Sequence, residues 1–300
     1  MSDAKKGCAY INGDYYSVEE AKISIYDRGF SGVSVFDALP LVNGYLFKVD
    51  PHVKRFFKSL KAARIEPPLS PDRLKEVIFE TVRRSGLKES AIVFMVATPG
   101  APVEPGFEKS GPKPSIIVSV TYLKMPPAHL PEKTYTEGIK VGISGTRNIP
   151  PQCLDQRIKS FNRLHHYLAI TEVLDAGADD VIMLDVHGNV SEGIYCNVWI
   201  VKDGCLFTPV GHLLHGITRD TVLEIAESDG IKAFETDLSP YDLYNADEVF
   251  FSTTAGGVLP IVEVDKRRVA DGRVGPITQR LLKVYERMLL DPKYATLVVE

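Results

Sequence analysis

The alternation of apolar and polar residues along the first half of the chain predicts strands followed by helices. One hairpin turns at Asn12-Gly13 and two further strands turn at Asn43-Gly44, because Asn-Gly pairs between alternating residues favour tight hairpin turns. Helical spacing begins at Asp50-Pro51 and again at Ser70-Pro71, where Asp or Ser caps the helix and Pro occupies its first turn. Two apolar strands then end the first half.

These two strands enclose a loop at residues 99–114. The loop is too rich in Pro and Gly for regular structure, and it is either a lid or a long hairpin connection. Three prolines within residues 124–138 then predict an extended linker. The chain therefore divides into a small N-terminal domain, a linker and a large C-terminal domain at residues 1–122, 123–138 and 139–300.

The second half alternates short groups of strands with single helices. A strand at residues 140–146 precedes a helix at 161–175, and residues 179–209 predict a meander of three strands. Further helices are predicted at 218–230 and 275–289. The helix at 161–175 is amphipathic, and its apolar face carries Leu164, Tyr167, Leu168, Thr171 and Leu174. This order of elements predicts α+β domains rather than a regular βαβ array.

Composition is that of an ordinary globular protein that acts on small molecules. Of its 300 residues, 44% are apolar and 25% are charged. A formal net charge of −4 provides no broad basic surface, so no nucleic-acid partner is expected. No apolar run reaches the length of a membrane span and the N-terminal residues contain no signal-peptide core, which predicts a cytoplasmic location and no membrane partner.

Common metal and nucleotide motifs are absent from the sequence. The four cysteines form no C-x-x-C pair, so buried reduced thiols are expected instead of a zinc site or a disulfide framework. His165 and His166 are adjacent on a predicted helix and point in different directions, so no metal site is predicted. Neither a G-x-G-x-x-G or Walker loop nor a G-x-S-x-G turn occurs, which weakens nucleotide binding and serine catalysis as functions.

Two charged residues of the second half are candidates for chemistry. Lys159 lies in RIKSFNRLHHY, where an extended stretch gives way to a helix, and it is either a solvated surface lysine or a nucleophilic amine. Glu192, in VSEGIYCN, lies on a predicted strand and is either outward and solvated or inward and paired. Strand alternation puts Glu192 on the same face as the apolar Val190, which favours the inward position.

Two turns, LLHGITRDT and FFSTTAGGVLP, are rich in backbone hydrogen-bond donors. A helix that begins near Thr218 offers unpaired N–H groups and a positive dipole end to a phosphate, although Thr218 is alternatively only the cap of its own helix. In the second turn, Thr253 and Thr254 supply hydroxyls, and the following glycines let a ligand approach the backbone. An ordinary turn at the end of a strand is the other interpretation.

A lysine, an inward carboxylate and a phosphate site together match pyridoxal phosphate. Its aldehyde condenses with a lysine, its ring nitrogen needs an acidic partner to stay protonated, and its phosphate needs an anchor. Over nearly the whole chain the sequence resembles the fold type IV (class IV) pyridoxal-phosphate aminotransferases. IKSFN resembles the lysine segment of this family, GADDVIMLDVHGNVSEGIYCNVWIVKDGCLFTP its central signature, and LLHGITRDTVLEIA and ADEVFFSTTAGGVLPI its phosphate-side segments. The resemblance implies an α+β fold of two domains, each with a mixed sheet and helices.

The resemblance also implies roles for individual residues. Lys159 would form the Schiff base with the cofactor, and Glu192 would pair with its pyridine nitrogen. The phosphate would be held by Ile217, Thr218 and Thr254, and by Arg55 from the segment HVKRFFKSLKAARI. The candidate substrate contacts are Thr253, Ala255, Phe36, Arg163 and Lys109.

The implied reaction begins when an amine displaces Lys159 from the cofactor. The freed lysine removes the Cα proton and returns a proton to C4′ of the cofactor, while Glu192 keeps the ring nitrogen protonated. A ketone or oxo acid is released, and a second oxo acid reverses the steps. We interpret Asn197 as support for Glu192, and the resemblance implies a homodimer.

The segments leave the substrate open. STTAGGVLPI and the C-terminal residues most resemble (R)-selective amine transaminases and their branched-chain-like relatives, whereas IKSFN is closer to D-amino-acid aminotransferases. Thr98-Pro99-Gly100 replaces the TRG segment that handles a substrate carboxylate in such relatives, so Lys109 or Arg163 is a candidate for the missing charge. We predict a transaminase that moves an amino group from an (R)-amine, a D-amino acid or a branched-chain amino acid to a 2-oxo acid, most like the (R)-selective enzymes. The alternatives are a branched-chain aminotransferase, a lyase of the aminodeoxychorismate lyase type, and a relative without activity.

Overall fold

Two compact units make up the protein. The computed structural model describes residues 7–102, 113–124, 127, 129–211 and 213–300. Unit 1 combines Met1–Lys124 with Ile158–Asn162 and Leu289–Glu300, and unit 2 combines Met125–Arg157 with Arg163–Met288. Both units are thus discontinuous in sequence, whereas the predicted division at 123–138 used continuous segments and stays a prediction. Among the described residues, no helix is both long enough and apolar enough to span a membrane.

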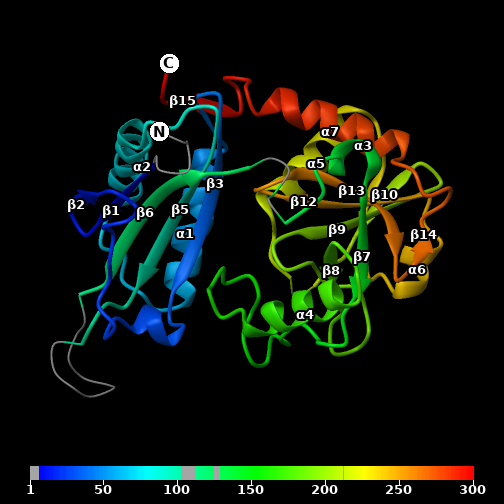
Figure 1. The fold of residues 1–300 in the computed structure, drawn as a ribbon, viewed down its shortest axis with the longest axis horizontal. Helices are drawn as coiled ribbons and strands as arrows, with labels where there is room; N and C mark the ends of the chain where they lie inside the picture. The colour runs from blue at the N-terminus through cyan, green and yellow to red at the C-terminus, as the bar shows by residue number, and fades with distance from the viewer. Residues whose placement is uncertain (1–6, 103–112, 125–126, 128, 212) are drawn as a thin grey trace. The chain divides into compact units, whose positions relative to one another are not determined.

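A seven-stranded sheet forms the centre of unit 1 (Figure 1). Its strand order is β15-β4-β3-β5-β6-β1-β2, and neighbouring strands pair antiparallel. The strands are β1 (Gly7–Ile11), β2 (Asp14–Tyr16), β3 (Val35–Val42), β4 (Tyr45–Phe47), β5 (Ser90–Thr98), β6 (Ser115–Tyr122) and β15 (Ala295–Leu297). Because β15 pairs with β4, the end of the chain belongs to the same sheet as its beginning.

The hairpin turns form where the sequence predicts them. Asn12-Gly13 has φ values of 53° and 124°, and Asn43-Gly44 has values of 47° and 82°. In unit 2, Asp203-Gly204 turns with φ values of 49° and 73°. Positive φ at both central positions suits the twist of a hairpin, and Asn, Asp and Gly tolerate it better than other residues.

Helices α1 (Val49–Ala62) and α2 (Pro71–Ser85) pack on the unit 1 sheet (Figure 1). Helix α2 begins as predicted, because Ser70 caps it by accepting a hydrogen bond from the Arg73 N–H, and it ends before Gly86 at a φ of 66°. Helix α1 begins two positions earlier than predicted, with Lys48 as its N-cap residue, so Asp50 lies in its first turn and not at its cap. Apolar residues of both helices enter the core with the strands, namely Val53, Phe56, Leu60, Leu74, Val77, Ile78 and Val82.

The sheet of unit 2 is mixed. Its order is β11-β10-β9-β12-β13-β7-β8, with β14 beside β13. The strands are β7 (Ile139–Ile143), β8 (Asp180–Ile182), β9 (Asn197–Lys202), β10 (Cys205–Thr208), β11 (Ala233–Glu235), β12 (Glu248–Thr253), β13 (Gly257–Val264) and β14 (Arg267–Arg268). Strand β7 runs parallel to β8 and β13, and β10 runs parallel to β11.

Both faces of this sheet are covered. Phe251 of β12 and Val198 of β9 enter the main core of unit 2. The alternate residues Phe250 and Trp199 stack on each other with ring centroids 5.7 Å apart, and the Trp199 indole N–H donates to Ser252 Oγ at 2.9 Å. Strands that are buried on both faces read as nearly continuous apolar runs, which explains the composition of β9 and β12.

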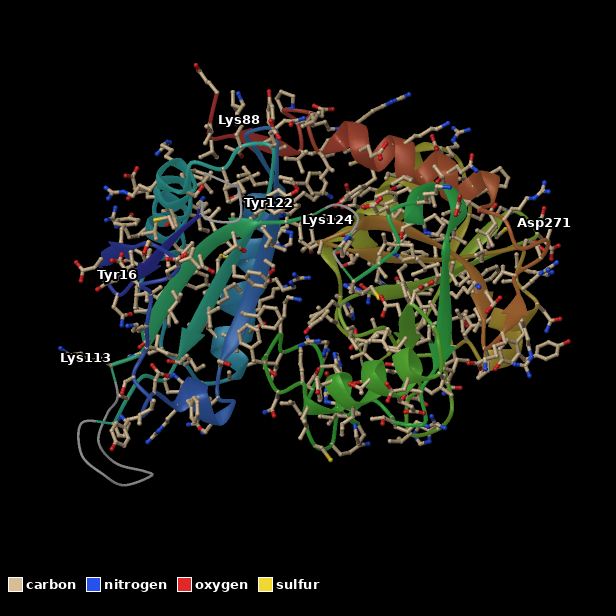
Figure 2. The ribbon with its side chains drawn as sticks, in the orientation of Figure 1. Tyr16, Lys88, Lys113, Tyr122, Lys124 and Asp271 are labelled. Carbon is tan, nitrogen blue, oxygen red and sulfur yellow. The ribbon has the colours of Figure 1, made fainter. Side chains whose placement is uncertain are left out.

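Five helices belong to unit 2: α3 (Thr134–Glu137), α4 (Leu164–Asp175), α5 (Ile217–Ser228), α6 (Pro240–Tyr244) and α7 (Pro276–Met288), counted over its described residues. Helix α3 lies inside the predicted linker, which is therefore not extended throughout. The Glu248 carboxylate accepts hydrogen bonds from the N–H groups of Ile277 and Thr278 at 3.0 and 2.7 Å, so β12 satisfies the first turn of α7. Exposed residues at the margins of the two units, such as Tyr16 and Asp271, point outward (Figure 2).

The predicted meander over residues 179–209 is wrong. Strand β8 pairs with β7 at one edge of the sheet, whereas β9 and β10 form a hairpin elsewhere in the strand order. Between β8 and β9 the chain makes only isolated bridges, Leu184 with Val190 and Glu192 with Asn197. Glu192 is therefore not on a regular strand. Apolar residues alone do not distinguish a strand from a buried irregular segment.

Helix α4 turns its apolar stripe outward. The exposed fractions of Leu164, Tyr167, Leu168 and Leu174 are 72%, 65%, 51% and 44%. On the opposite side Ala169 and Val173 are buried against Val181 and Met183. The apolar face of an amphipathic helix ordinarily packs on its own core. We call the exposed group Leu164, Tyr167, Leu168 and Leu174 the α4 face.

Candidate active site

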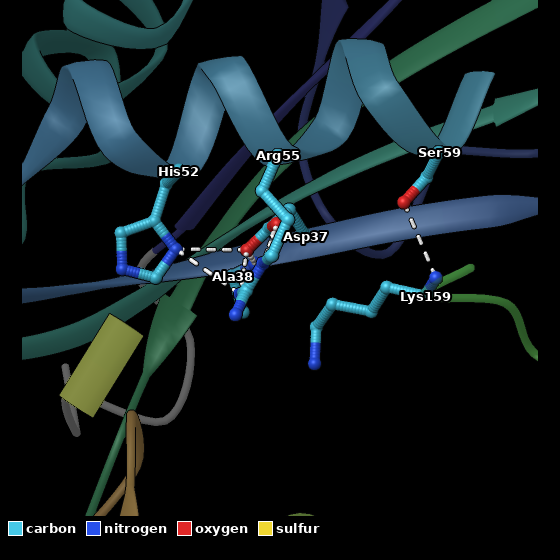
Figure 3. A network of polar contacts seen from close by, with 6 residues as sticks. All are labelled: Asp37, Ala38, His52, Arg55, Ser59 and Lys159. Atoms are coloured by element: carbon cyan, nitrogen blue, oxygen red, sulfur yellow. Dashed lines mark hydrogen bonds and ion pairs between the residues drawn. The ribbon is translucent and has the colours of Figure 1, made fainter. Parts of the chain in front are cut away.

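Lys159 is buried in unit 1 and lies outside any helix. Its exposed fraction is 9%, and the segment around it runs beside β3. The Phe36 N–H donates to the Lys159 carbonyl at 2.8 Å, and the Lys159 N–H donates to Ser59 Oγ on α1 at 3.2 Å (Figure 3). Burial of this degree is rare for a lysine without a specific role, so the interpretation as a solvated surface residue does not hold.

One aromatic ring lies near the amine of Lys159, and a second ring stacks on the first. Its Nζ is 4.6 Å from the centroid of the Phe36 ring. Phe36 stacks on Phe161 with centroids 4.1 Å apart and an angle of 8° between the ring planes. Phe161, which follows the lysine by two residues, was not among the predicted site residues. The Phe36 ring therefore supplies an apolar surface beside the amine, and Phe161 packs on that ring.

Arg55 of α1 is held by Asp37 of β3 (Figure 3). Its Nε donates to Asp37 Oδ2 and its Nη2 donates to Asp37 Oδ1, both at 2.7 Å. His52, one turn earlier on α1, places Nδ1 at 2.8 Å from Asp37 Oδ1. The Asp37 side chain is fully buried. A two-point contact of this kind fixes the plane of the guanidinium.

Burial and neighbouring charges determine the protonation states of Asp37 and His52. Burial raises the pKa of Asp37, but the charge of Arg55 and the hydrogen bonds from Arg55 and His52 outweigh it and hold the pKa well below its usual range. Burial lowers the pKa of His52, so at neutral pH the imidazole is neutral and Nδ1 donates its proton to Asp37. The same two elements, β3 and α1, therefore position both the Lys159 segment and the cationic Arg55.

Glu192 is buried in unit 2, with an exposed fraction of 5%. Its Oε1 accepts a hydrogen bond from Asn148 Nδ2 and its Oε2 accepts one from the Leu214 N–H, each at 3.2 Å. The inward position favoured by the sequence pattern is thus confirmed by burial, although the residue only bridges to Asn197. Donors on both oxygens favour the ionised carboxylate.

Asn197 anchors the segment that leads into α5. Its Nδ2 donates to the Leu214 carbonyl at 2.8 Å. A Cβ on Gly216 would lie 2.2 Å from Asn197 Oδ1, so only glycine fits this close approach. Because Leu214 also donates to Glu192, Asn197 supports that carboxylate through the loop, in agreement with its interpretation from the sequence.

The first turn of α5 has backbone donors available for an anion. Gly216 is the N-cap residue and makes no side-chain cap, so Thr218 is not the cap of its own helix. Ile217 and Thr218 are both buried, with exposed fractions of 8% and 4%. First-turn N–H groups and the positive end of the helix dipole together suit a phosphate.

Tyr285 of α7 joins the start of α5 to the turn between β12 and β13. It forms a hydrogen bond with Thr218, which partly offsets the burial that raises the pKa of Tyr285 to about 12. A Cβ on Gly257, whose φ is 65°, would lie 2.7 Å from the Tyr285 ring. The ring thus packs directly on the glycine. No local motif marks Tyr285 in the sequence, and it was not predicted.

The turn between β12 and β13 is also tied to the Glu192 segment. Thr253 Oγ1 donates to the Tyr195 carbonyl at 2.9 Å. The two residues that follow Thr253 are partly exposed in the turn, and the Gly256 carbonyl accepts a hydrogen bond from Tyr135 Oη at 3.0 Å. Unit 2 therefore brings together three predicted segments, the residues around Glu192, the start of α5 and the β12–β13 turn.

Of the two predicted cationic substrate contacts, the structure describes Arg163 but not Lys109. Arg163 is the N-cap residue of α4, and its Nη1 donates to the Ile194 carbonyl at 2.9 Å. Its guanidinium is 5.7 Å from the centroid of the Tyr195 ring, so Arg163 also adjoins the Glu192 segment. Lys109 lies outside the described residues.

Comparison with known proteins identifies the family. The model of amino-transferase class IV matches residues 34–264. The chain belongs to the class IV aminotransferases. A branched-chain-amino-acid aminotransferase of Pseudomonas aeruginosa is 34% identical over 294 residues, which cover 95% of this chain and 93% of that protein.

Solved structures of branched-chain amino acid aminotransferases share the fold of this class IV aminotransferase. The T.th. enzyme with pyridoxamine 5′-phosphate has a TM-score of 0.90 and 31% identity, and the match covers 98% of this chain and 99% of that one. The same T.th. enzyme complexed with N-(5′-phosphopyridoxyl)-L-glutamate has a TM-score of 0.88 and 30% identity, with the same coverage. The predicted family, fold type, aminotransferase activity and pyridoxal phosphate cofactor are confirmed.

The donor groups of this aminotransferase fit that cofactor. Lys159 is a buried amine, Glu192 is a buried carboxylate with donors on both oxygens, and α5 starts without a side-chain cap. These are the three groups that an aldehyde, a ring nitrogen and a phosphate require. Unit 1 thus provides the amine, and unit 2 provides the carboxylate and the helix start, each in a protected position.

Besides Phe161 and Ser59, the sequence interpretation missed four further supporting residues. Asp37, His52, Asn148 and Tyr285 each contact a predicted site residue. Asp37 had a signal that could have been used, since it is an acidic residue inside the apolar run Val35–Val42. The other three have no comparable local signal.

Proposed function

We propose that this class IV aminotransferase transfers the amino group of L-leucine, L-isoleucine or L-valine to 2-oxoglutarate. The single observation that carries the proposal is similarity over nearly the full length to enzymes named for branched-chain amino acids. The L-glutamate adduct in the T.th. structure supports an L-configured product of the acceptor. The segments that resemble (R)-selective amine transaminases are limited to the C-terminal part, so we rank (R)-amines and D-amino acids below.

Each of the buried groups has a distinct role in this proposal. Pyridoxal phosphate, when bound, supplies an aldehyde for imine formation and a ring that accepts electrons from the substrate. The Nζ atom of Lys159 would hold the cofactor through that aldehyde and, once the substrate amine has freed it, would take up the proton from Cα. The Glu192 carboxylate holds a proton on the ring nitrogen by electrostatic attraction.

The phosphate of the cofactor is assigned to the start of α5, at Ile217 and Thr218, with Thr254 and Arg55. The backbone donors at the start of α5, which have no side-chain cap, support the first part of this assignment. The two-point contact with Asp37 supports the second, because it leaves the orientation of Arg55 fixed before the anion arrives. Fixed donors lose less entropy on binding than mobile ones.

The carboxylate of the substrate is assigned to the β12–β13 turn. Thr254 and Ala255 are partly exposed there, and Tyr135 and Thr253 hold the turn in place. Phe36 is proposed to line the side-chain pocket, since its ring lies beside the Lys159 amine. Arg163 and Lys109 stay candidates for an additional positive charge.

The visible absorption spectrum tests the proposal. The protein is loaded with pyridoxal phosphate and mixed separately with L-leucine, D-alanine and (R)-1-phenylethylamine. We expect L-leucine to convert the bound cofactor to its amino form, and 2-oxoglutarate to reverse the change. Lys159→Ala should lose the band of the lysine-bound cofactor, whereas Lys54→Ala, which changes an exposed lysine of α1, should retain it.

Each other outcome has a definite meaning. Faster conversion by (R)-1-phenylethylamine or D-alanine would overturn the substrate assignment and restore the alternative from the sequence. Product formation from L-leucine that needs no oxo acid would indicate a lyase. A Lys159→Ala protein that reacts as well as the wild type would remove Lys159 from its role.

We also propose that the enzyme is a homodimer that buries the α4 face. The resemblance to the family implies a dimer, and an exposed group of four large apolar residues on one helix is unusual for a monomer. Leu164, Tyr167, Leu168 and Leu174 lie at helical spacing, so a second copy could cover them together.

A further inference from the structure

Asn148 is buried beside Glu192 and makes a complete set of hydrogen bonds. Its exposed fraction is 3%, and its backbone N–H donates to the Leu184 carbonyl at 2.9 Å. Its Nδ2 donates to Ser191 Oγ at 2.9 Å and to Glu192 Oε1 at 3.2 Å. Both amide protons of the side chain are therefore used.

The orientation of the Asn148 amide follows from a backbone group. The Ile149 N–H donates to Asn148 Oδ1 at 3.0 Å, and a backbone N–H cannot act as an acceptor. The reversed amide would set its NH₂ group against this N–H and its carbonyl oxygen against the Glu192 carboxylate. Two repulsive contacts would result, so only one orientation is compatible with the structure.

His165 of α4 makes the second contact to the same oxygen. Its Nε2 is 3.2 Å from Asn148 Oδ1, and because that oxygen only accepts, Nε2 carries the proton. Burial, together with the nearby Arg163, lowers the pKa of His165 to about 4, so the imidazole is neutral at physiological pH. A line of hydrogen bonds thus runs from His165 through Asn148 to Glu192.

We propose that Asn148 is a positioning residue for Glu192 and that His165, together with the Ile149 N–H, holds its amide in this direction. This assignment rests on the proposed role of Glu192. In it, the Asn148 amide donates to the carboxylate, keeps it ionised and directs it at the ring nitrogen of the cofactor. The Leu214 N–H holds the other oxygen. A carboxylate with donors on both oxygens stays charged, and a charged carboxylate retains the proton on the pyridine ring.

A purely structural role is the competing explanation. Asn148 connects its own segment to Leu184 and Ser191, so its loss could simply loosen the fold. The two explanations differ in what happens to the ring nitrogen. A structural role predicts lower stability without a change in the protonation of the bound cofactor, whereas the positioning role predicts that the ring loses proton occupancy.

The test uses pyridoxal phosphate labelled with nitrogen-15 in the ring, bound to the wild type and to three variants. Asn148→Asp keeps the shape but replaces the Nδ2 donor with an acceptor next to Glu192. Glu192→Gln removes the proposed partner itself, and Asn245→Asp makes the same chemical change at an exposed position of unit 2. The nitrogen-15 shift reports ring protonation directly, and circular dichroism checks the fold.

We expect Asn148→Asp and Glu192→Gln both to move the nitrogen-15 signal toward the unprotonated value, and Asn245→Asp to leave it unchanged. With Asn148→Asp, kcat should fall about tenfold to a hundredfold, the loss typical of a hydrogen bond to a charged group, with a smaller change in KM. If Glu192→Gln moves the signal and Asn148→Asp does not, the positioning proposal is overturned. If Glu192→Gln itself has no effect, the proposed role of Glu192 fails instead.

A pair of His165 variants keeps the question decidable if Asn148→Asp does not fold. His165→Gln retains an N–H donor for Asn148 Oδ1, whereas His165→Leu removes it. The proposal expects a shift of the nitrogen-15 signal with His165→Leu and its restoration with His165→Gln. Equal signals from these two variants would overturn it.

Discussion

Arg55 and Asp37 form a two-point ion pair, with two N–H···O contacts of 2.7 Å, in which the carboxylate is completely buried. The exposed fraction of the Arg55 side chain is only 11%. A pair taken out of water in this way contributes little net stability compared with apolar residues of the same shape, but breaking it leaves a buried charge. The pair is therefore better explained by the need for a fixed cation than by stability.

The substitution Asp37→Asn should be strongly destabilising. The amide keeps the shape but leaves the Arg55 charge without its counter-ion, which costs about 3–5 kcal/mol in the free energy of unfolding. Urea titration followed by far-UV circular dichroism measures the change. Glu80→Gln, which breaks the exposed pair with Arg84 on α2, is the matched control and should have little effect. Equal losses from both variants would contradict the prediction.

His165 should make the protein less stable in mild acid. Its pKa in the folded protein is about 4, below the ordinary value of 6.5, so the unfolded chain binds more protons between these two values. The contribution of the neutral His165 to the free energy of unfolding is fully present above pH 6.5 and is lost as the pH drops toward 4. His165→Gln should remove this part of the decline, whereas His187→Gln, at an exposed histidine, should not. Parallel stability curves for the wild type and His165→Gln over this range would refute the explanation.

Substitutions at two glycines with positive φ distinguish the cost of backbone strain from the cost of a steric clash. Gly177, at a φ of 86°, has open space where a Cβ would lie, so Gly177→Ala should cost about 1 kcal/mol from its backbone alone. Gly257→Ala adds a contact of 2.7 Å with the Tyr285 ring and should cost clearly more. Because Tyr285 bonds to Thr218, Gly257→Ala should also weaken the affinity for pyridoxal phosphate, measured by fluorescence titration. The same stability loss at both positions would mean that Tyr285 moves freely.

The α4 face provides a test of assembly. Leu168→Glu places a charge in the centre of this face and should shift the mass measured by light scattering from dimer toward monomer. Leu168 is 51% exposed in the chain alone, so the substitution should leave the fold intact by circular dichroism. Lys58→Glu on α1 is the control and should remain dimeric. A Leu168→Glu protein that stays fully dimeric would place the interface elsewhere.

Local patterns predicted those parts of the fold that depend on neighbouring residues. The Asn-Gly turns and the limits of α2, from Ser70 to Gly86, follow from backbone preferences that act over a few positions. The orientation of α4 did not follow, because its exposed stripe has the same spacing as a core-facing one. The pairing of β8 with β7 likewise depends on contacts distant in sequence.

The candidate site likewise combines residues that local sequence identifies with residues that only distant contacts bring in. Residues with distinctive chemistry in recognisable segments, such as Lys159 and Glu192, were identified from the sequence as candidates. Their supports were not, because Asn148 meets Glu192 across 44 positions of the chain and Ser59 meets Lys159 across 100. Nothing local to an asparagine or a serine indicates a partner so far away. Only folding brings such pairs together.

Trp199, stacked on Phe250 and bonded to Ser252, is the one tryptophan of the whole sequence. It lies in unit 2, so indole fluorescence is an optical reporter of that unit alone. Circular dichroism, in contrast, averages over both units. If the two signals change at the same urea concentration, the two units unfold cooperatively. If the fluorescence changes at a different concentration, unit 2, which carries Glu192, unfolds independently of unit 1, which carries Lys159.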